Sequence, residues 1–446
     1  MLLLSVVAVV ILNLPSGNVV SVGSTDSRGA GLYARLSTDG GKKWSAGCLN
    51  LEPERSGFAD VTGQVLSNGL IRVEYVRNSR GTSERLTAQF REDDVRYGRL
   101  LTGEAKIRTI LDAGGRWDWI PGSELPQEGR GWKETSTPYV RLPDRLKGVV
   151  PASVWNLSRH SSGIVYRFRT DSKALRIHWT VGDRHLGSHI MTAAGKSGVD
   201  VYARSKGGDW HFVKGSRPMI PTNEIELRWK PGDECMIYLP LYNVVLDFAV
   251  AVTKGATIER LLVRSNGVVK PVVCYGTSIT HGASASRPGL CWTAIAARRA
   301  DVPLINLGFA GSAKMEMSME RALAEVDASL YVIDSLWNMD EKMVKERYEP
   351  FVRALHTARP ETPILCVEDC SSTEDRTAKG RIVESLVSRL KAEDSRLWAN
   401  LHFMTNLEEM ERDGEETVDG CHPNDRGHKS MGEGFARKFV NILCNH

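Results

Sequence analysis

A serine at the end of a short apolar run is the feature of this sequence with the clearest chemical meaning. Residues 272–275 are apolar, and the tripeptide Gly-Thr-Ser at 276–278 ends the run abruptly. A hydroxyl placed at the carboxyl end of a buried parallel strand lies where open α/β sheets build their sites. Far downstream, Asp419 and His422 offer an orienting carboxylate and a general base for Ser278. These residue types predict acyl transfer by a serine nucleophile, which also needs an oxyanion hole.

The elements that must position these residues follow from the pattern after residue 269, where strands and helices alternate. Amphipathic spacing predicts a helix over 341–358, and a last helix is expected from about 425 to 443, directly after His422. Such alternation predicts a compact α/β domain, here 269–446, with a mostly parallel sheet. The expected strands are 272–275, 303–307, 329–334, 363–367 and 401–404.

Four short blocks of this domain occur in a set order. They are 276–280, 306–311, 334–338 and 419–423. One block alone would mean little, because a serine also caps helices and glycines also form turns. As a set, the blocks resemble the SGNH (GDSL-type) hydrolase superfamily over nearly all of residues 270–446. The resemblance implies a three-layer α/β fold and ester chemistry.

The resemblance implies one role for each matching residue. Ser278 is expected to be the nucleophile and to offer its own backbone N–H to the oxyanion. Gly311 would add a second backbone N–H, and Asn338 a side-chain amide. His422 would take the serine proton and return it to the leaving alcohol, while Asp419 holds the histidine tautomer. No metal or other cofactor is implied.

Two positions depart from the family's pattern. Thr277 stands where an aspartate is usual, at a position that is not catalytic in the family. Trp337 stands before the oxyanion asparagine, where glycine is common. A bulky indole there would narrow the acyl pocket, which favours a short acyl group such as acetyl.

Alternating strands and frequent turns predict an antiparallel β-sandwich of jelly-roll type over 132–268, without convincing helices. The run 198–202, Gly-Val-Asp-Val-Tyr, resembles the Gly-x-Asp-Leu-Tyr signature of a domain that precedes some of these hydrolases. Asp200 and Tyr202 could contact substrate, but roles in a strand, turn or core are favoured. A linker is expected at 109–131, which is rich in Gly and Pro.

The segment 17–108 also reads as short strands separated by turns. Residues 37–44 have the spacing of an Asp-box, the hairpin turn repeated on the blades of sialidase-like propellers. The segment therefore resembles a fragment of such a propeller, although it is too short to supply the four to eight blades that close one. The other interpretation is a small β appendage that packs on its neighbour.

The first 16 residues are either an apolar leader or a strand. Residues 2–14 suit the core of a signal peptide and are too short for a membrane span, but no Lys or Arg precedes them. Export, to the periplasm or outside the cell, is the favoured expectation, and a strand in a cytoplasmic protein is the alternative. No integral membrane span is predicted.

Composition narrows the possible partners and cofactors. The net charge of +4 is spread along the chain without a basic stripe, so no nucleic-acid partner is expected. Eight Cys in 446 residues make no disulfide framework, and the close pair Cys366 and Cys370 lacks zinc spacing.

Several other polar residues invite a functional interpretation that is not favoured. The histidines His185, His189 and His281 are expected to be packed in the protein or exposed on its surface. The carboxylates of Glu368 and Asp369, which follow a strand, are expected either to line the cleft or to cap a helix.

The leading hypothesis is a serine esterase that removes short acyl groups, with acetyl preferred, from a small-molecule or glycan ester. A carbohydrate is suggested by the sandwich and the propeller-like segment, and a sialic acid ester is one option. An acyltransferase with the same residues, or a non-catalytic carbohydrate-binding protein with a degenerate hydrolase fold, are the alternatives.

Overall fold

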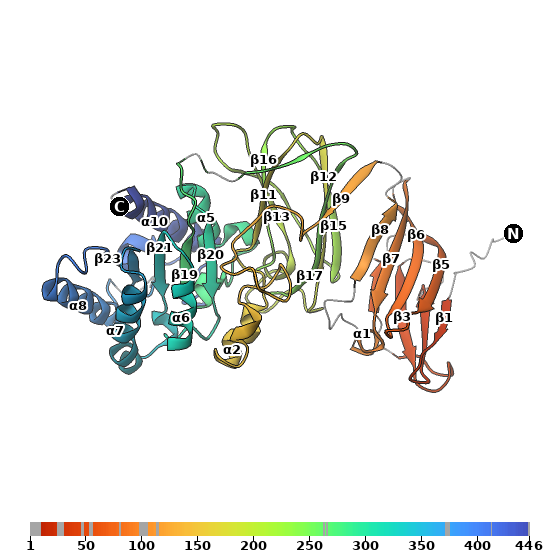
Figure 1. The fold of residues 1–446 in the computed structure, drawn as a ribbon, viewed down its shortest axis with the longest axis horizontal. Coiled ribbons are helices and arrows are strands. Elements are labelled where there is room, and N and C mark those ends of the chain that lie inside the picture. Colours follow the sequence, from red (N-terminus) through yellow and green to blue (C-terminus); the bar gives the residue numbers. More distant parts are fainter. Residues whose placement is uncertain are drawn as a thin grey trace.

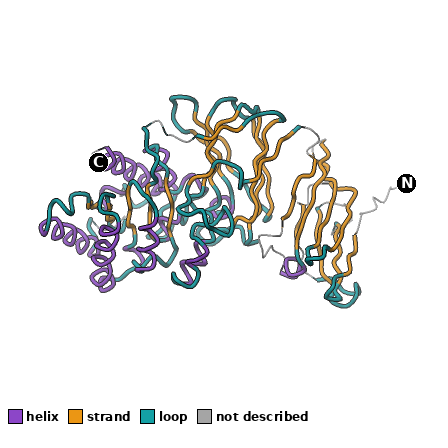
Figure 2. Tube along the Cα trace, in the orientation of Figure 1, coloured by secondary structure: helices purple, strands orange, loops and turns teal. Residues whose placement is uncertain are grey.

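The computed structural model shows strands throughout the first half of the chain and helices concentrated at the carboxyl-terminal end (Figure 2). In the part of the chain that the structure describes, no helix is both long and apolar enough to cross a membrane. The described residues are 10–24, 31–45, 49–52, 57–79, 82–97, 106–112, 116–261, 264, 266–370, 375–411 and 413–444.

The amino-terminal segment folds into two antiparallel four-stranded sheets around one shared apolar core. Val20, Ile71, Tyr75 and Phe90 are buried in that core. The sheets lie at one end of the molecule (Figure 1) and consist of β1 (Val10–Asn13), β2 (Val19–Gly23), β3 (Leu32–Ser37) and β4 (Leu49–Glu52), then β5 (Gly57–Val65), β6 (Ile71–Ser79), β7 (Thr82–Phe90) and β8 (Lys106–Asp112), with the short helix α1 (Glu92–Tyr97) between β7 and β8.

Two sequence expectations bear on this segment. Of the run expected to be a leader or a strand, residues 10–13 form β1, which pairs with β2, and residues 1–9 lie outside the described part. In the turn after β3, the Asp39 carboxylate accepts a 2.8 Å hydrogen bond from the Lys43 N–H. This hydrogen bond belongs to a local turn, and it shows no kinship to sialidases.

The middle of the chain is a β-sandwich, as expected. One sheet has the order β15 (Thr222–Arg228), β12 (Ala174–Val181), β17 (Val245–Thr253) and β9 (Trp117–Pro121). The other has the order β10 (Gln127–Glu128), β11 (Val165–Thr170), β16 (Glu234–Tyr238), β13 (Asp200–Arg204) and β14 (His211–Gly215), with β18 (Ile258–Arg260) also on β11. Phe168, Ile177, Trp179 and Phe248 fill the core between the two sheets.

The expectation of a linker at 109–131 is wrong over its second half. Residues of β9 pair with β17, and those of β10 pair with β11, so both strands belong to the sandwich. Gly122 and Gly129 allow close packing and do not mark a flexible linker. A Cβ on Gly129 would lie 2.0 Å from the Gly163 carbonyl oxygen, and one on Gly122 would lie 2.7 Å from the Tyr166 hydroxyl.

The sandwich region also contains helices that the strand pattern did not predict. They are α2 (Ala152–Ser158) and α3 (Ala193–Ser197). Trp132, Leu146 and Val154, from the same stretch as α2, are buried in the core of the following α/β domain. Their apolar side chains are thus explained by packing on the neighbouring domain, which sequence periodicity does not reveal.

The carboxyl-terminal domain has the expected three layers. Its parallel sheet has the order β20 (Leu304–Gly308), β19 (Val272–Gly276), β21 (Leu330–Asp334), β22 (Ile364–Val367) and β23 (Leu401–Met404), each within a residue of the predicted bounds. The first three of these strands are buried along their whole length, as strands covered on both faces are. Apolar side chains of α5 (Trp292–Ala300) and α10 (Asp425–Cys444) share one core, and those of α6 (Met317–Glu325), α7 (Glu341–Ala358) and α8 (Ala378–Glu393) share the other.

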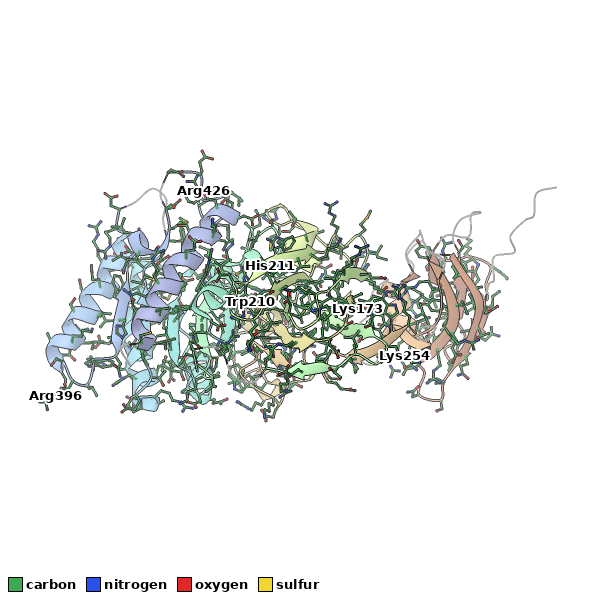
Figure 3. All side chains as sticks on the ribbon, turned by 90° about the horizontal axis from the view of Figure 1, so that it is seen from above. Lys173, Trp210, His211, Lys254, Arg396 and Arg426 are labelled. Atoms are coloured by element: carbon green, nitrogen blue, oxygen red, sulfur yellow. The ribbon has the colours of Figure 1, made fainter. Side chains whose placement is uncertain are left out.

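The signature residues of the sandwich dock it onto this α/β domain. The buried Asp200 carboxylate accepts hydrogen bonds from Arg287 Nη1 at 2.6 Å and from the Gly289 N–H at 3.0 Å. The Arg298 guanidinium lies 4.0 Å from the centre of the Tyr202 ring. Trp210 lies in the same border region (Figure 3). The Gly-x-Asp-x-Tyr motif therefore holds two domains together.

Candidate active site

Ser278 is the first residue of the short helix α4 (Ser278–His281), which follows β19 after a single residue. Two glycines allow this helix to lie directly on the sheet. A Cβ on Gly276 would lie 2.1 Å from Thr280 Oγ1, and one on Gly308 would lie 2.1 Å from the His281 nitrogen. The Thr277 side chain caps the helix by accepting from the Ile279 N–H.

A hydrogen-bonded relay links the serine to its expected partners. Ser278 Oγ lies 3.0 Å from His422 Nε2, and His422 Nδ1 lies 2.8 Å from Asp419 Oδ2. The other carboxylate oxygen of Asp419 accepts from the backbone N–H groups of Cys421 and His422 at 3.0 and 2.8 Å. With the Nδ1 proton facing a carboxylate, the Nε2 lone pair is turned to the serine.

The carboxylate in this relay is held in its charged form. Partial burial raises the pKa of Asp419, but the hydrogen bonds from the His422 backbone, the His422 ring and the Cys421 backbone outweigh burial. The pKa of Asp419 therefore lies below its ordinary value. Because the group is ionised well below neutral pH, it can orient His422 at neutral pH.

The expected oxyanion donors lie around the same point. Gly311 has a positive φ of 67°, and no atom lies within 4 Å of the Cβ that another residue would carry there. The Asn338 amide donates one hydrogen to the Ser312 carbonyl at 2.6 Å, which leaves its second hydrogen for another acceptor. Among the bonds of the described residues, neither the Ser278 N–H nor the Gly311 N–H donates to another protein group.

These residues open into a cleft of about 480 Å³ that both domains line. The sandwich contributes the segment 188–191 together with Lys196 and Tyr242, and the α/β domain contributes the remaining wall. The full lining is Ser188, His189, Ile190, Met191, Lys196, Tyr242, Ser278, Ala283, Ala310, Gly311, Trp337, Asn338, Cys421 and His422.

Sequence reasoning missed the wall that the sandwich contributes. His189 is exposed at the edge of the cleft, and the apolar Ile190 and Met191 follow it. No spacing in the sequence relates this segment to Ser278, because it is brought there by domain packing. Tyr242 had a weak signal, since the run 239–243 also resembles the module that carries the Gly-x-Asp-Leu-Tyr motif.

The other tempting polar residues take no part in the relay of Ser278, His422 and Asp419. Glu368 accepts from the Thr377 N–H at 2.6 Å ahead of α8, and Asp369 pairs with Lys379 at 2.9 Å, so these carboxylates are structural. His281 is buried and packed against a tyrosine ring, and His185 is exposed beside Asp183. Within the described residues, no group of three or more His, Cys, Asp or Glu is arranged to hold a metal ion.

Replacing Asn338 with Ala removes the side-chain amide that is expected to serve as an oxyanion donor. We expect kcat for p-nitrophenyl acetate to fall by about 10²–10³-fold, because removing such a donor costs that much in other acyl-transfer enzymes. KM should change little, since the donor acts mainly on the charge that develops in the transition state. A variant that keeps kcat and only raises KM would contradict this role.

Comparison with known proteins matches two families to this chain. The GDSL-like lipase/acylhydrolase family matches residues 269–440. The GxDLY family, described as the N-terminus of SGNH-hydrolase-type esterases, matches residues 117–258. Neither match extends to residues 37–44, so neither supports a relation to sialidase-like propellers. No curated protein matches the chain.

Several solved structures are similar to this chain. A GDSL-like lipase from Bacteroides ovatus is 29% identical over 74% of this chain and 98% of its own, with a TM-score of 0.65. The salicylyl-acyltransferase SsfX3 of a tetracycline biosynthetic pathway is 18% identical over 73% of this chain and 97% of its own, with a TM-score of 0.58. A family two carbohydrate esterase from Cellvibrio japonicus is 12% identical over 74% and 98%, with a TM-score of only 0.46.

The family matches therefore agree with the architecture described above: residues 269–440 form a GDSL-type lipase/acylhydrolase domain, and residues 117–258 form the GxDLY domain that precedes it.

Proposed function

We propose that this protein is a serine esterase that removes a short acyl group, with acetyl preferred, from a carbohydrate. The observation that carries the ester chemistry is the relay in which Ser278 Oγ, His422 and Asp419 are joined by contacts of 3.0 and 2.8 Å at one end of an open cleft. The preference for a short acyl group and for a sugar rests on the shape and lining of that cleft.

In the proposed mechanism, Ser278 Oγ attacks the ester carbonyl carbon while His422 Nε2 takes the hydroxyl proton. The negative charge that forms on the carbonyl oxygen is received by the N–H groups of Ser278 and Gly311 and by the Asn338 amide. Collapse breaks the ester C–O bond, and His422 returns the proton to the leaving alcohol. Water then attacks the acyl-enzyme, again with His422 as base, and releases the carboxylic acid and the free serine.

Trp337 supports the proposal of a short acyl group. Its ring lines the cleft next to Asn338, and its indole N–H donates to Cys370 Sγ at 3.4 Å. The Lys379 ammonium lies 5.6 Å from the ring centre. These contacts hold the indole in place, so a long acyl chain would have to displace it.

The wall that the sandwich contributes to the cleft supports a polar leaving alcohol. Ser188 and His189 are exposed there and present hydrogen-bonding groups to solvent-filled space. Lys196 lies nearby, with its charge balanced by Asp183 at 2.9 Å. A hydroxyl-rich alcohol such as a sugar fits this polar edge, whereas the acyl group fits the side of Trp337.

Replacing Trp337 with Ala tests the acyl-length proposal. We expect the wild type to hydrolyse p-nitrophenyl acetate better than the octanoate, and Trp337→Ala to raise kcat/KM for the octanoate by about tenfold or more. Burial of each further methylene contributes about 0.8 kcal/mol once space is available. Trp210→Ala, away from the cleft, is the matched control. An unchanged preference in Trp337→Ala would contradict the proposal.

The sugar is tested by measuring acetate release from a panel of acetylated monosaccharides, acetylated oligosaccharides, acetylated sialic acids and simple alkyl acetates. We expect at least one sugar ester to exceed ethyl acetate in kcat/KM by about tenfold or more, because only it can use the polar edge of the cleft. Equal rates for all acetates would refute the carbohydrate assignment and leave the ester chemistry standing.

Acyl transfer to an alcohol is the competing outcome for the same residues. The acyl-enzyme is open to whichever nucleophile reaches it, and the cleft between the domains has room for an acceptor besides water. Product analysis with an excess of a sugar or glycerol acceptor separates the two reactions. Free acid as the main product supports the hydrolase, and a new ester as the main product supports the transferase.

A further inference from the structure

Tyr242, a residue of the sandwich, contacts the helix that carries the nucleophile. Its hydroxyl donates to the Ser278 carbonyl oxygen at 3.1 Å. Its ring stacks on the His281 imidazole, with 3.8 Å between ring centres and 15° between the planes. Because α4 consists of only Ser278–His281, one side chain from the other domain touches the first and the last residue of this helix.

Burial keeps both Tyr242 and His281 in one protonation state. Burial raises the pKa of Tyr242, so its hydroxyl stays protonated and donates at every working pH. Burial also lowers the pKa of His281, so that ring is neutral. The His281 Nε2 lies 2.9 Å from the Leu241 carbonyl oxygen. The Ser162 hydroxyl donates to the His281 carbonyl at 2.8 Å. The sandwich thus holds the carboxyl end of α4 through three residues.

The buried Arg141 links the sandwich region to β20, the strand beside β19. Arg141 Nη1 donates to the carbonyl oxygens of Asn306 and Gly308 at 3.1 and 2.8 Å, at the end of β20. Its Nε donates to the His160 carbonyl at 2.9 Å, within the sandwich region. The sandwich is therefore bonded both to α4 and to the strand that leads into the Gly311 loop.

From these contacts we propose that Tyr242 is a positioning residue that sets the place of the nucleophile from the sandwich domain. The proposal rests on the esterase function above. The Ser278 carbonyl already accepts from the Gly282 and Ala283 N–H groups at 3.0 and 2.9 Å, so Tyr242 supplies a third donor that ties α4 to a second domain. A serine displaced by a fraction of an ångström loses its alignment with His422, and a misplacement of about 1 Å can cost about 10²-fold in rate.

The chain offers a matched control for this role. The Tyr202 hydroxyl, also from the sandwich, donates to a backbone carbonyl of the α/β domain, that of Gly289, at 3.3 Å. Gly289 lies in the 3-10 turn η2 (Pro288–Leu290) and is not among the residues that line the cleft. Tyr242→Phe removes the interdomain bond to Ser278. Tyr202→Phe removes the bond to Gly289 and a second one, at 2.8 Å, that Arg287 Nη1 donates to the Tyr202 hydroxyl. Both changes keep the ring.

The experiment compares Tyr242→Phe, Tyr202→Phe and the wild type in the full chain, at temperatures where circular dichroism shows all three folded. Two rates are measured: kcat for p-nitrophenyl acetate and the second-order rate of Ser278 labelling by a fluorophosphonate. We expect Tyr242→Phe to lower both by about 5–20-fold with KM within about twofold, and Tyr202→Phe to leave both unchanged. The loss of thermal stability in Tyr202→Phe is expected to be at least as large as that in Tyr242→Phe, because the Tyr202 hydroxyl makes two interdomain hydrogen bonds.

The outcomes separate the positioning role from the proposed function. If the wild type is labelled at Ser278 but both Phe variants are labelled at the wild-type rate, the positioning role is refuted and the esterase proposal stands. Equal losses in both variants would show a general effect of loosened domains and would also refute it. A wild type that neither hydrolyses esters nor reacts with the fluorophosphonate refutes both proposals.

Discussion

Ser278→Ala is expected to abolish ester hydrolysis, with a fall in kcat of at least about 10⁴-fold. No other group in the relay can form the acyl-enzyme once Oγ is gone, and loss of the serine in comparable relays costs far more than loss of any binding contact. The measurement is p-nitrophenyl acetate turnover by purified protein, with the fold checked by circular dichroism. Fluorophosphonate labelling should be lost in the same variant.

Ser388→Ala, on the exposed face of α8, is the matched control and should keep full activity and labelling. Retained turnover in Ser278→Ala would refute the mechanism. A wild type that is well folded but never labelled at Ser278 would instead favour the alternative of a non-catalytic binding protein. The pair of measurements therefore tests the chemistry before any natural substrate is known.

Asp419→Asn is expected to lower kcat by about 10⁴-fold while the geometry of the loop is kept. An amide oxygen can still accept from the Cys421 and His422 backbone N–H groups, as Oδ1 does in the wild type. The amide NH₂ would then face His422 Nδ1, which forces the proton onto Nε2 and removes the lone pair that takes the serine proton. The loss should lie in kcat, because no substrate contact changes.

Asp327→Asn serves as the control, since that exposed carboxylate pairs with Lys270 at 3.0 Å on the surface. Rates are to be compared across pH 5–9. Because hydrogen bonds hold the pKa of Asp419 below its ordinary value, protonation of this carboxylate should cause no loss of wild-type activity in that range. An Asp419→Asn variant with more than about a tenth of wild-type kcat would contradict the relay as described.

Much of the catalytic half could be predicted from the sequence because its signals are local. The strand that ends at Gly276 is apolar along its length, and burial on both faces requires that pattern. The helix over 341–358 repeats its apolar residues at helical spacing, and the structure has α7 at the same bounds. Asp419 and His422 share one short loop, so their spacing alone suggested that both act together.

The sandwich half was predicted less well because its signals depend on distant contacts. Gly122 and Gly129 indicated a linker, but they are needed where strands from elsewhere in the chain approach closely. Apolar residues around α2 belong to the core of the next domain. Propensity and periodicity describe what a segment can do alone, and they carry no information on which distant segment covers it.

From the sequence alone, Ser278, His422 and Asp419 could be predicted as nucleophile, base and orienting carboxylate, together with the fold class that holds them. The surroundings of these residues followed only from the folded protein. The tertiary structure placed the segment 188–191 and Tyr242 of the sandwich in the wall of the cleft, and it assigned Asp200 to the contact between domains. The short sequence blocks of the α/β domain could be related to one another because residues at the ends of adjacent parallel strands meet in any sheet of this topology. The docking of two domains, by contrast, depends on side chains that are far apart in the chain and meet only after both have folded.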